Sequence, residues 1–270
     1  MLLLRPAFLT RRAGVSYLAR VNPESFYDRY WQSGIHRTGE WPEARMQRVL
    51  APLLGLDRVL DYGCGMGHAY QRTLSASVKE YVGADVSSRA LEHARECGLG
   101  ALPINPQNSR IEAPDAAFNG VASVEVFEHL FDPLVAAREL FRVLKPGGVV
   151  VLTVPNFGYH EYRLLALLRA QVPSEPEDPK GNRYNGVHIR FFSKLMLTRL
   201  LRDAGFEDVR VGSFDDGSIW DVFRAGGPLA VVSDFARRHL PSFLHLRFLQ
   251  DVWPNVFAKR LRAVARKPRA

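Results

Sequence analysis

Cysteine is scarce in this chain of 270 residues, which contains only Cys64 and Cys97. The two match neither a disulfide framework nor a metal-binding spacing, so the sequence predicts a protein of a reducing compartment, and we expect a cytoplasmic location. Long apolar runs are also missing, because no stretch approaches the roughly 18–20 residues that cross a bilayer. We find no internal repeat and no low-complexity tract, and the 47% of hydrophobic residues excludes disorder throughout.

Acidic residues are absent from the beginning of the sequence until Glu24, while four arginines precede it. We interpret residues 1–44 as an N-terminal arm, with a weak transit peptide or a membrane-surface segment over residues 1–20 as the alternatives. The formal net charge is +8. Much of the excess lies near the C-terminus, in Arg237, Arg238, Arg247, Lys259, Arg260, Arg262, Arg266, Lys267 and Arg269. This surplus favours an anionic partner, whether a phosphorylated substrate, a membrane surface or a nucleic acid.

Strand-like and helix-like patterns alternate along most of the chain. We expect strands over 58–62, 80–84, 100–104, 120–124, 149–154, 206–211 and 256–265. We expect helices over 42–54, 68–78, 88–97, 133–144, 161–170 and 193–204. This alternation predicts an α/β fold built on a doubly wound sheet with right-handed crossovers.

Two segments depart from the alternation. Residues 173–186 are rich in Pro, Glu, Asp, Gly and Asn, and we expect them to form a loop that, with His160 and Tyr162, determines acceptor specificity. Residues 213–254 read as an insertion before the last strand, rich in both apolar and basic side chains. The apolar ones need a cover, which the domain itself, the partner in a homodimer or a membrane surface would supply.

Three glycines at alternate positions, Gly63, Gly65 and Gly67, follow the first strand, and Asp85 ends the second. Glycines at a strand-to-helix turn let the backbone approach a ligand closely. A carboxylate at the end of the next strand is placed to accept both hydroxyls of a ribose. The third position after Gly65 is His68, which departs from a dinucleotide fingerprint, and Asp61 suits a ligand with an amino group. Together these features predict a cofactor that carries a nucleoside.

These segments resemble the motifs of class I S-adenosylmethionine (SAM)-dependent methyltransferases. Val59–Gly67 and Tyr81–Asp85 are similar to the first two motifs, Val121–Pro133 and Glu139–Pro155 to those of the fourth and fifth strands. The resemblance is strongest to ubiquinone-biosynthesis and glycan-tailoring O-methyltransferases. It implies a Rossmann-like sheet, mostly parallel with an antiparallel last strand and helices on both faces, in a domain over 45–270 preceded by lid helices within 1–44.

The resemblance also implies roles for individual residues. Asp61 would reach toward the amino group of SAM, and Asp85 would bind the ribose. Val86 would lie against the adenine. The remaining positions fall into two groups. Those lining the methionyl part are Gly63, Cys64 and Gly65, and those near the sulfonium are Ser123, Val124 and Glu125. In similar enzymes the aromatic side chains at Tyr27, Tyr30 and Trp31 belong to the lid.

The pattern Glu125-x-x-Glu128-His129 follows the fourth strand at the mouth of the expected site. It resembles a pattern that binds a divalent cation in plant small-RNA and ubiquinone O-methyltransferases, with His188 in the place of a distant fourth ligand. Two carboxylates and two imidazoles could hold Mg²⁺, Mn²⁺, Fe²⁺ or Zn²⁺. The alternative is that His129 acts as a general base without a metal, or only packs.

We therefore expect an enzyme that uses SAM to methylate an oxygen of a small molecule or a glycan, with an anionic or lipid-linked acceptor consistent with the basic surplus. An RNA 2′-O-methyltransferase is the first alternative, although no separate RNA-binding module is visible. A non-catalytic SAM-binding protein is the second. A location peripheral to a membrane would suit a lipid-linked acceptor.

Overall fold

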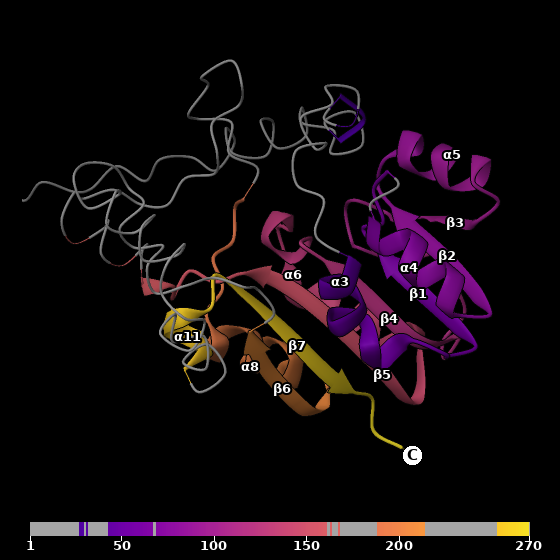
Figure 1. The fold of residues 1–270 in the computed structure, drawn as a ribbon. Coiled ribbons are helices and arrows are strands. Elements are labelled where there is room, and N and C mark those ends of the chain that lie inside the picture. The colour runs from indigo at the N-terminus through magenta and orange to yellow at the C-terminus, as the bar shows by residue number, and fades with distance from the viewer. Residues whose placement is uncertain are drawn as a thin grey trace, which may run out of the picture.

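The computed structural model describes residues 27–29, 31, 43–66, 69–160, 163, 167, 188–213 and 253–269. In this part of the chain, the strands form one sheet in the order β3-β2-β1-β4-β5-β7-β6 (Figure 1). The strands are β1 (Arg58–Tyr62), β2 (Glu80–Asp85), β3 (Gly100–Pro103), β4 (Phe118–Val124), β5 (Leu144–Pro155), β6 (Glu207–Ser213) and β7 (Arg260–Arg266). The helices are α3 (Glu43–Leu50), α4 (Ala69–Ser77), α5 (Ser88–Glu96), α6 (Pro133–Val143), α8 (Lys194–Asp203) and α11 (Pro254–Phe257), with 3-10 turns η2 (Ala51–Leu53) and η3 (Phe127–His129).

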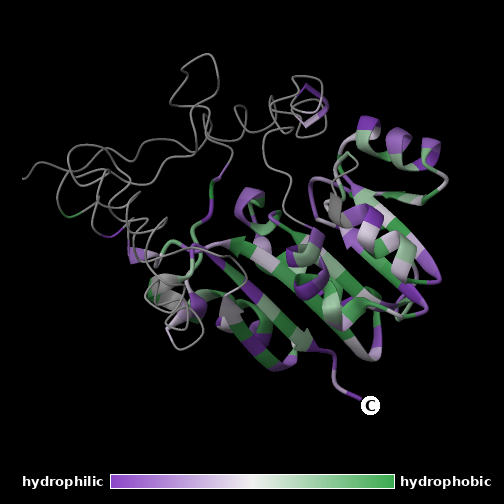
Figure 2. Ribbon diagram, in the orientation of Figure 1, coloured by the Kyte–Doolittle hydropathy of each residue, from purple (hydrophilic) through white to green (hydrophobic). Residues whose placement is uncertain are grey.

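Both faces of the sheet are covered by helices. Neighbouring residues of a strand point to opposite faces, and in β1 the side chain of Val59 joins the core formed with α3 and α4. The next residue, Leu60, joins the core formed with α6 and α8. Figure 2 shows the central strands as largely hydrophobic along their length, as expected of strands buried on both faces. The prediction of a doubly wound α/β sheet with helices on both faces is confirmed.

Strands β1 to β5 run parallel, and β7 runs antiparallel between β5 and β6. The expected antiparallel last strand is therefore present, but its predicted start at residue 256 is wrong. Pro254 occupies the first turn of α11, a position where its missing N–H costs no helical hydrogen bond. The helix lasts until Phe257, and the strand begins at Arg260.

Strand β5 begins earlier than expected, at Leu144 rather than Val149. Leu144 pairs with Phe118 and Val149 with Gly120, so the ladder shifts register over the Lys145-Pro-Gly-Gly148 segment that we predicted as a turn. Gly147 has a φ of 76°, which favours glycine. The Nζ of Lys145 donates to Oδ1 of Asn119 at 3.2 Å and ties this excursion to β4.

The strand order reverses direction between β1 and β4. In an open α/β sheet such a reversal separates the loops at the carboxyl ends of the two strands and leaves a crevice where ligands bind. The predicted cofactor residues lie at the carboxyl ends of β1, β2 and β4 or in the loops that directly follow them. The topology therefore places the candidate site at this point of the sheet.

No helix among the described residues is long and apolar enough to cross a membrane. Several sequence predictions fall outside the described residues: most of the arm over 1–44, most of the helix over 161–170, the loop over 173–186 and nearly all of the insertion over 213–254. They stay predictions, as do the domain boundaries.

Candidate active site

The turn after β1 is shaped by its glycines. Gly63 has a φ of 78° and Gly65 a φ of 56°, a region that L side chains rarely adopt. A Cβ on Gly63 would also lie 2.4 Å from Cγ2 of Val126, so the turn has no room for a side chain there. The N–H groups of Gly63 and Cys64 donate to the carbonyl of Ala84 at 2.7 and 3.0 Å, which fixes the turn against β2.

Asp85 joins the turn after β1 to the turn after β2. Its carboxylate accepts hydrogen bonds from the N–H of Gly65 and the N–H of Ser87, each at 2.9 Å. Burial raises the pKa of Asp85, and these backbone hydrogen bonds oppose that shift. A carboxylate has about four acceptor positions, so the arrangement is compatible with further hydrogen bonds from ribose hydroxyls. Val86 follows it and packs half-buried against the core.

Asp61 and Cys64, two further predicted cofactor residues, lie at the turn after β1. Asp61 is fully buried and accepts a hydrogen bond from the hydroxyl of Tyr81 at 2.6 Å. Cys64 is buried, and burial raises the pKa of its thiol. The Nε2 of Gln71 donates to the Cys64 carbonyl at 2.5 Å. Sequence reasoning missed Tyr81 and Gln71, because only the folded chain brings them to the turn.

At the end of β4 the structure gives Glu125 a partner that the sequence did not suggest. Ser123 donates through Oγ to the carbonyl of Tyr62 at 3.1 Å, which ties β4 to β1. Glu125 has a φ of 54°, unusual for a non-glycine residue. Its Oε2 lies 3.1 Å from Nε of Arg260 in an ion pair. Val124, between Ser123 and Glu125, is buried.

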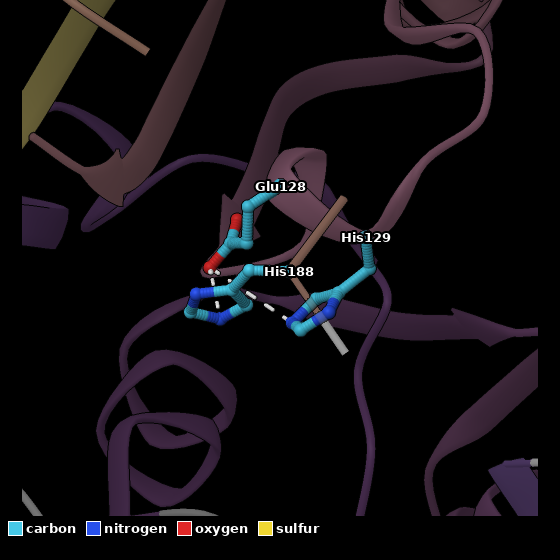
Figure 3. Close-up of side chains that lie close together, drawn as sticks. All are labelled: Glu128, His129 and His188. Carbon is cyan, nitrogen blue, oxygen red and sulfur yellow. Dashed lines mark ion pairs between the residues drawn. The ribbon is translucent and has the colours of Figure 1, made fainter. Parts of the chain in front are cut away.

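Three of the four predicted metal ligands lie together. Figure 3 shows Glu128 with the imidazoles of His129 and His188 directed toward its carboxylate. Oε1 of Glu128 lies 3.6 Å from Nε2 of His188 and 3.9 Å from Nε2 of His129, and Glu128 is almost fully buried. Two ligands that each sit about 2 Å from one ion lie about 3–4 Å apart, so this donor set fits a divalent cation. Glu125, the fourth predicted ligand, is outside the set that could share one ion.

The backbone holds His188 in place. The N–H groups of Ile189 and Arg190 both donate to the carbonyl of Glu128 at 2.9 Å. This pair of hydrogen bonds brings the segment before α8 to η3, although about 60 residues of sequence separate them. The spatial proximity of His188 to Glu128 and His129, which the sequence predicted only by resemblance, is present.

Two consecutive N-terminal residues, Tyr27 and Asp28, contact His129 and the turn after β2, respectively. The ring of Tyr27 meets the ring of His129 edge-on, with centroids 6.3 Å apart. Asp28 accepts a hydrogen bond from the hydroxyl of Ser87, two residues after the ribose-binding candidate Asp85. One helical turn therefore touches both halves of the site. The position of Tyr27 is compatible with the predicted lid, whereas Tyr30 lies outside the described residues.

Comparison with known proteins identifies the family. The family model described as "Methyltransferase domain" matches residues 24–211. A Mycolicibacterium smegmatis protein named "Probable S-adenosylmethionine-dependent methyltransferase" is 32% identical over 61% of this chain and 57% of its own length. A "Ubiquinone biosynthesis O-methyltransferase" of Ruegeria pomeroyi is 34% identical over 58% of this chain and 62% of its own. The chain thus matches less than two thirds of the length of these relatives.

A solved structure agrees with the fold. A SAM-dependent methyltransferase from Archaeoglobus fulgidus superposes with a TM-score of 0.54 at 19% identity, covering 83% of this chain and 92% of that one. At this identity the likeness concerns the fold alone, and it supports a Rossmann-like sheet in the described part of the molecule.

Proposed function

Because the chain belongs to the class I SAM-dependent methyltransferases, we propose that it methylates a hydroxyl oxygen of a small-molecule or glycan acceptor. The observation that carries this proposal is the cluster of His129, His188 and Glu128, which Tyr27 and Asp28 join to the turn after β2 that follows Asp85. A hydroxyl is a weak nucleophile until its proton is removed or its pKa is lowered. Two imidazoles beside a buried carboxylate offer the means.

SAM supplies an electrophilic methyl group on a sulfonium, and the chain has to bind it and align the acceptor. In this proposal Asp85 accepts the ribose hydroxyls, and Asp61 faces the amino group of the methionyl part. Gly63, Cys64 and Gly65 line that part through a backbone that leaves no room for a side chain at Gly63. Val86 lies against the adenine, and Ser123, Val124 and Glu125 lie near the sulfonium.

Activation of the acceptor takes one of two forms. As the acceptor oxygen forms its bond to the methyl carbon and the carbon–sulfur bond breaks, the hydroxyl proton passes to a ring nitrogen of His129. Alternatively, Glu128, His129 and His188 hold a divalent cation, which would lower the pKa of the acceptor hydroxyl. Glu125 would be a poorer ligand for such a cation, because its carboxylate forms an ion pair with Arg260.

The acceptor class is tested with methyl-labelled SAM. Purified protein is incubated with catechols and quinols, free and lipid-linked sugars, and tRNA, and labelled products are identified by mass spectrometry. We expect an O-methylated quinol or sugar, with anionic or lipid-linked forms preferred. Label in RNA alone would replace the proposal with an RNA methyltransferase, and binding of SAM without label in any acceptor would favour a protein that binds SAM without turnover.

The two forms of activation differ in their response to a chelator and to the two histidines. If a cation is required, dialysis against EDTA removes activity, Mg²⁺, Mn²⁺ or Zn²⁺ restores it, and His129→Gln and His188→Gln both lower metal content. If His129 is the base, the chelator has no effect, and only His129→Gln removes most of the activity. Full activity in both variants would exclude both forms.

A further inference from the structure

The hydrogen bond between Tyr81 and Asp61 is unexplained by the cofactor motifs. Asp61 lies in β1 opposite Gly83 of β2, and Tyr81 lies two pairs earlier, opposite Val59. All four side-chain positions face the side of the sheet that α3 and α4 cover. The Tyr81 ring therefore has to extend along the sheet, toward the carboxyl end of the strands, for its hydroxyl to come within 2.6 Å of Oδ2 of Asp61.

Gly83 lies beside the ring of Tyr81 and leaves room for the thiol of Cys64. A Cβ on Gly83 would lie 3.6 Å from Cε1 of Tyr81 and 2.8 Å from Sγ of Cys64. A side chain at position 83 would displace the thiol of Cys64. Cys64 follows Gly63, the first residue of the glycine turn. The ring of Tyr81, the thiol of Cys64 and the carboxylate of Asp61 therefore occupy one packed layer directly beneath that turn.

The buried carboxylate needs such a donor. Asp61 has no exposed surface and Tyr81 only 5%, and an ionised carboxylate away from water is costly unless hydrogen bonds stabilise it. Asp85 meets this need with backbone N–H groups, whereas at Asp61 a side-chain hydroxyl contributes. A backbone donor is fixed by the fold, but a tyrosine can be replaced, so its contribution can be measured.

We infer that Tyr81 is a positioning residue, which orients the Asp61 carboxylate toward the amino-acid end of the cofactor and so gives the site its preference for ligands that carry that end. The inference rests on the proposed function, in which Asp61 faces the methionyl amino group. Tyr81 itself contacts Asp61 and acts on the ligand through it. Its effect should thus be confined to ligands that carry an amino-acid group.

The test compares two ligands that share the adenosine and the sulfur. S-adenosylhomocysteine carries the amino-acid group, and 5′-methylthioadenosine lacks it. Titration calorimetry gives the Kd of each ligand for the wild type and for Tyr81→Phe, which deletes only the hydroxyl. We expect the Kd of S-adenosylhomocysteine to rise about tenfold, as for a lost hydrogen bond to a charged group. The Kd of 5′-methylthioadenosine should stay within about twofold, because the adenosine contacts are untouched.

The matched control is Tyr62→Phe. Tyr62 is also a buried tyrosine, but it follows Asp61 on β1 and packs on the opposite face of the sheet, against Phe127. Its substitution should leave the ratio of the two Kd values unchanged. In the Asp61→Asn background, Tyr81→Phe should have almost no further effect, since the two residues act as one unit.

The outcomes separate the inference from the function it rests on. If the wild type binds neither ligand, the proposed cofactor site is wrong. If it binds both, and Tyr81→Phe weakens both equally or neither, Tyr81 has only a structural role. The inference would also be overturned if Tyr81→Phe changed the Kd of S-adenosylhomocysteine equally in the wild type and in the Asp61→Asn background. Should Tyr81→Phe melt too early to be titrated, both ligands are titrated against the wild type and this variant at a lower temperature at which the variant is folded, and an unchanged ratio of Kd values there contradicts the inference.

Discussion

If Asp85 binds the cofactor as proposed, this one buried side chain should make ligand binding and fold stability depend on pH in opposite directions. Its pKa is raised from 3.8 by burial. The ionised carboxylate accepts hydrogen bonds and the protonated form loses part of that capacity, so affinity for S-adenosylhomocysteine should fall as pH drops through the raised pKa. The free energy of unfolding contributed by this group should rise over the same interval, because the folded state then binds the proton more tightly than the unfolded state does.

Calorimetry between pH 4 and 7, paired with denaturant unfolding at each pH, measures both trends. Asp85→Asn should weaken binding at pH 7 by about tenfold or more, since one backbone N–H of the turn then faces an amide donor. It should also flatten the acid limb of the binding curve. Affinity that is constant down to pH 4 in the wild type would contradict the assignment of Asp85 to the ribose.

Gly63 and Gly98 separate backbone strain from steric overlap. Both have positive φ, 78° and 73°, but a Cβ on Gly63 would collide with Val126, whereas nothing lies within 4 Å of a Cβ on Gly98. Gly98→Ala should lower the free energy of unfolding by about 1 kcal/mol, the cost of the left-handed conformation alone. Gly63→Ala should cost clearly more and should abolish binding of S-adenosylhomocysteine. Denaturant unfolding of the two variants checks the difference, and equal losses would show that Val126 moves aside freely.

Among the secondary-structure elements, α6 is held to the preceding loop by one guanidinium. Arg142 pairs with the buried Glu139 at 2.6 Å and with the exposed Asp115 at 2.5 Å, and it donates to the carbonyls of Ala113 and Ile111. Oε1 of Glu139 in turn accepts the N–H of Ile111 at 2.7 Å. The pKa of Arg142 is raised, chiefly by its hydrogen bond to Glu139.

Arg142→Met should lower the free energy of unfolding by about 2 kcal/mol, because it leaves a buried carboxylate without its cation. The loss is smaller than for a fully buried pair, since the guanidinium keeps some contact with water. Arg138→Met, an exposed change on the same helix, should alter stability by less than about 0.5 kcal/mol. Urea unfolding compares the free energies of unfolding of the two variants. Similar values would mean that the contacts of Arg142 contribute little to stability.

Local chemistry in the sequence was enough to place most elements. Ser87, Ser193 and Gly205 mark helix ends, and β-branched runs mark the strands, because each signal acts over a few residues. The prediction of a turn at Lys145-Pro-Gly-Gly148 is wrong, because a register shift within a strand has a sequence that resembles a turn. The predicted start of the last strand at residue 256 is too early, because the alternation of apolar residues cannot reveal a helix of four residues that begins at a proline.

In the candidate site, too, some features could be predicted from the sequence and others could not. The glycine turn and Asp85 follow from spacing within one strand–turn–helix unit, and the histidine cluster follows from the family resemblance. The ion pair of Glu125 with Arg260 spans 135 residues, and the contact of Tyr81 with Asp61 depends on the register of two strands. Nothing local encodes such contacts, because they arise only when the sheet is assembled.

For the molecule as a whole, β7 completes the sheet. It pairs with β5 on one side and β6 on the other, and Leu261, Ala263 and Ala265 are fully buried. Removal of all residues after Lys259 should abolish cooperative unfolding, because β6 then has no neighbour and β5 becomes an exposed apolar edge. Thermal unfolding followed by circular dichroism tests this. Removal of residues 269 and 270 alone should leave the transition nearly unchanged.

The position of β7 also has a consequence for biosynthesis. A ribosome makes β7 after the other six strands of the described sheet, yet β7 lies between two of them. Until β7 emerges from the ribosome, β6 has no strand of the described sheet to pair with. The apolar edge of β5 is then exposed, and strands of other chains could pair with it. The same strand brings Arg260 to Glu125. The growing polypeptide therefore gains protection from aggregation and finishes one wall of its candidate active site in a single late event.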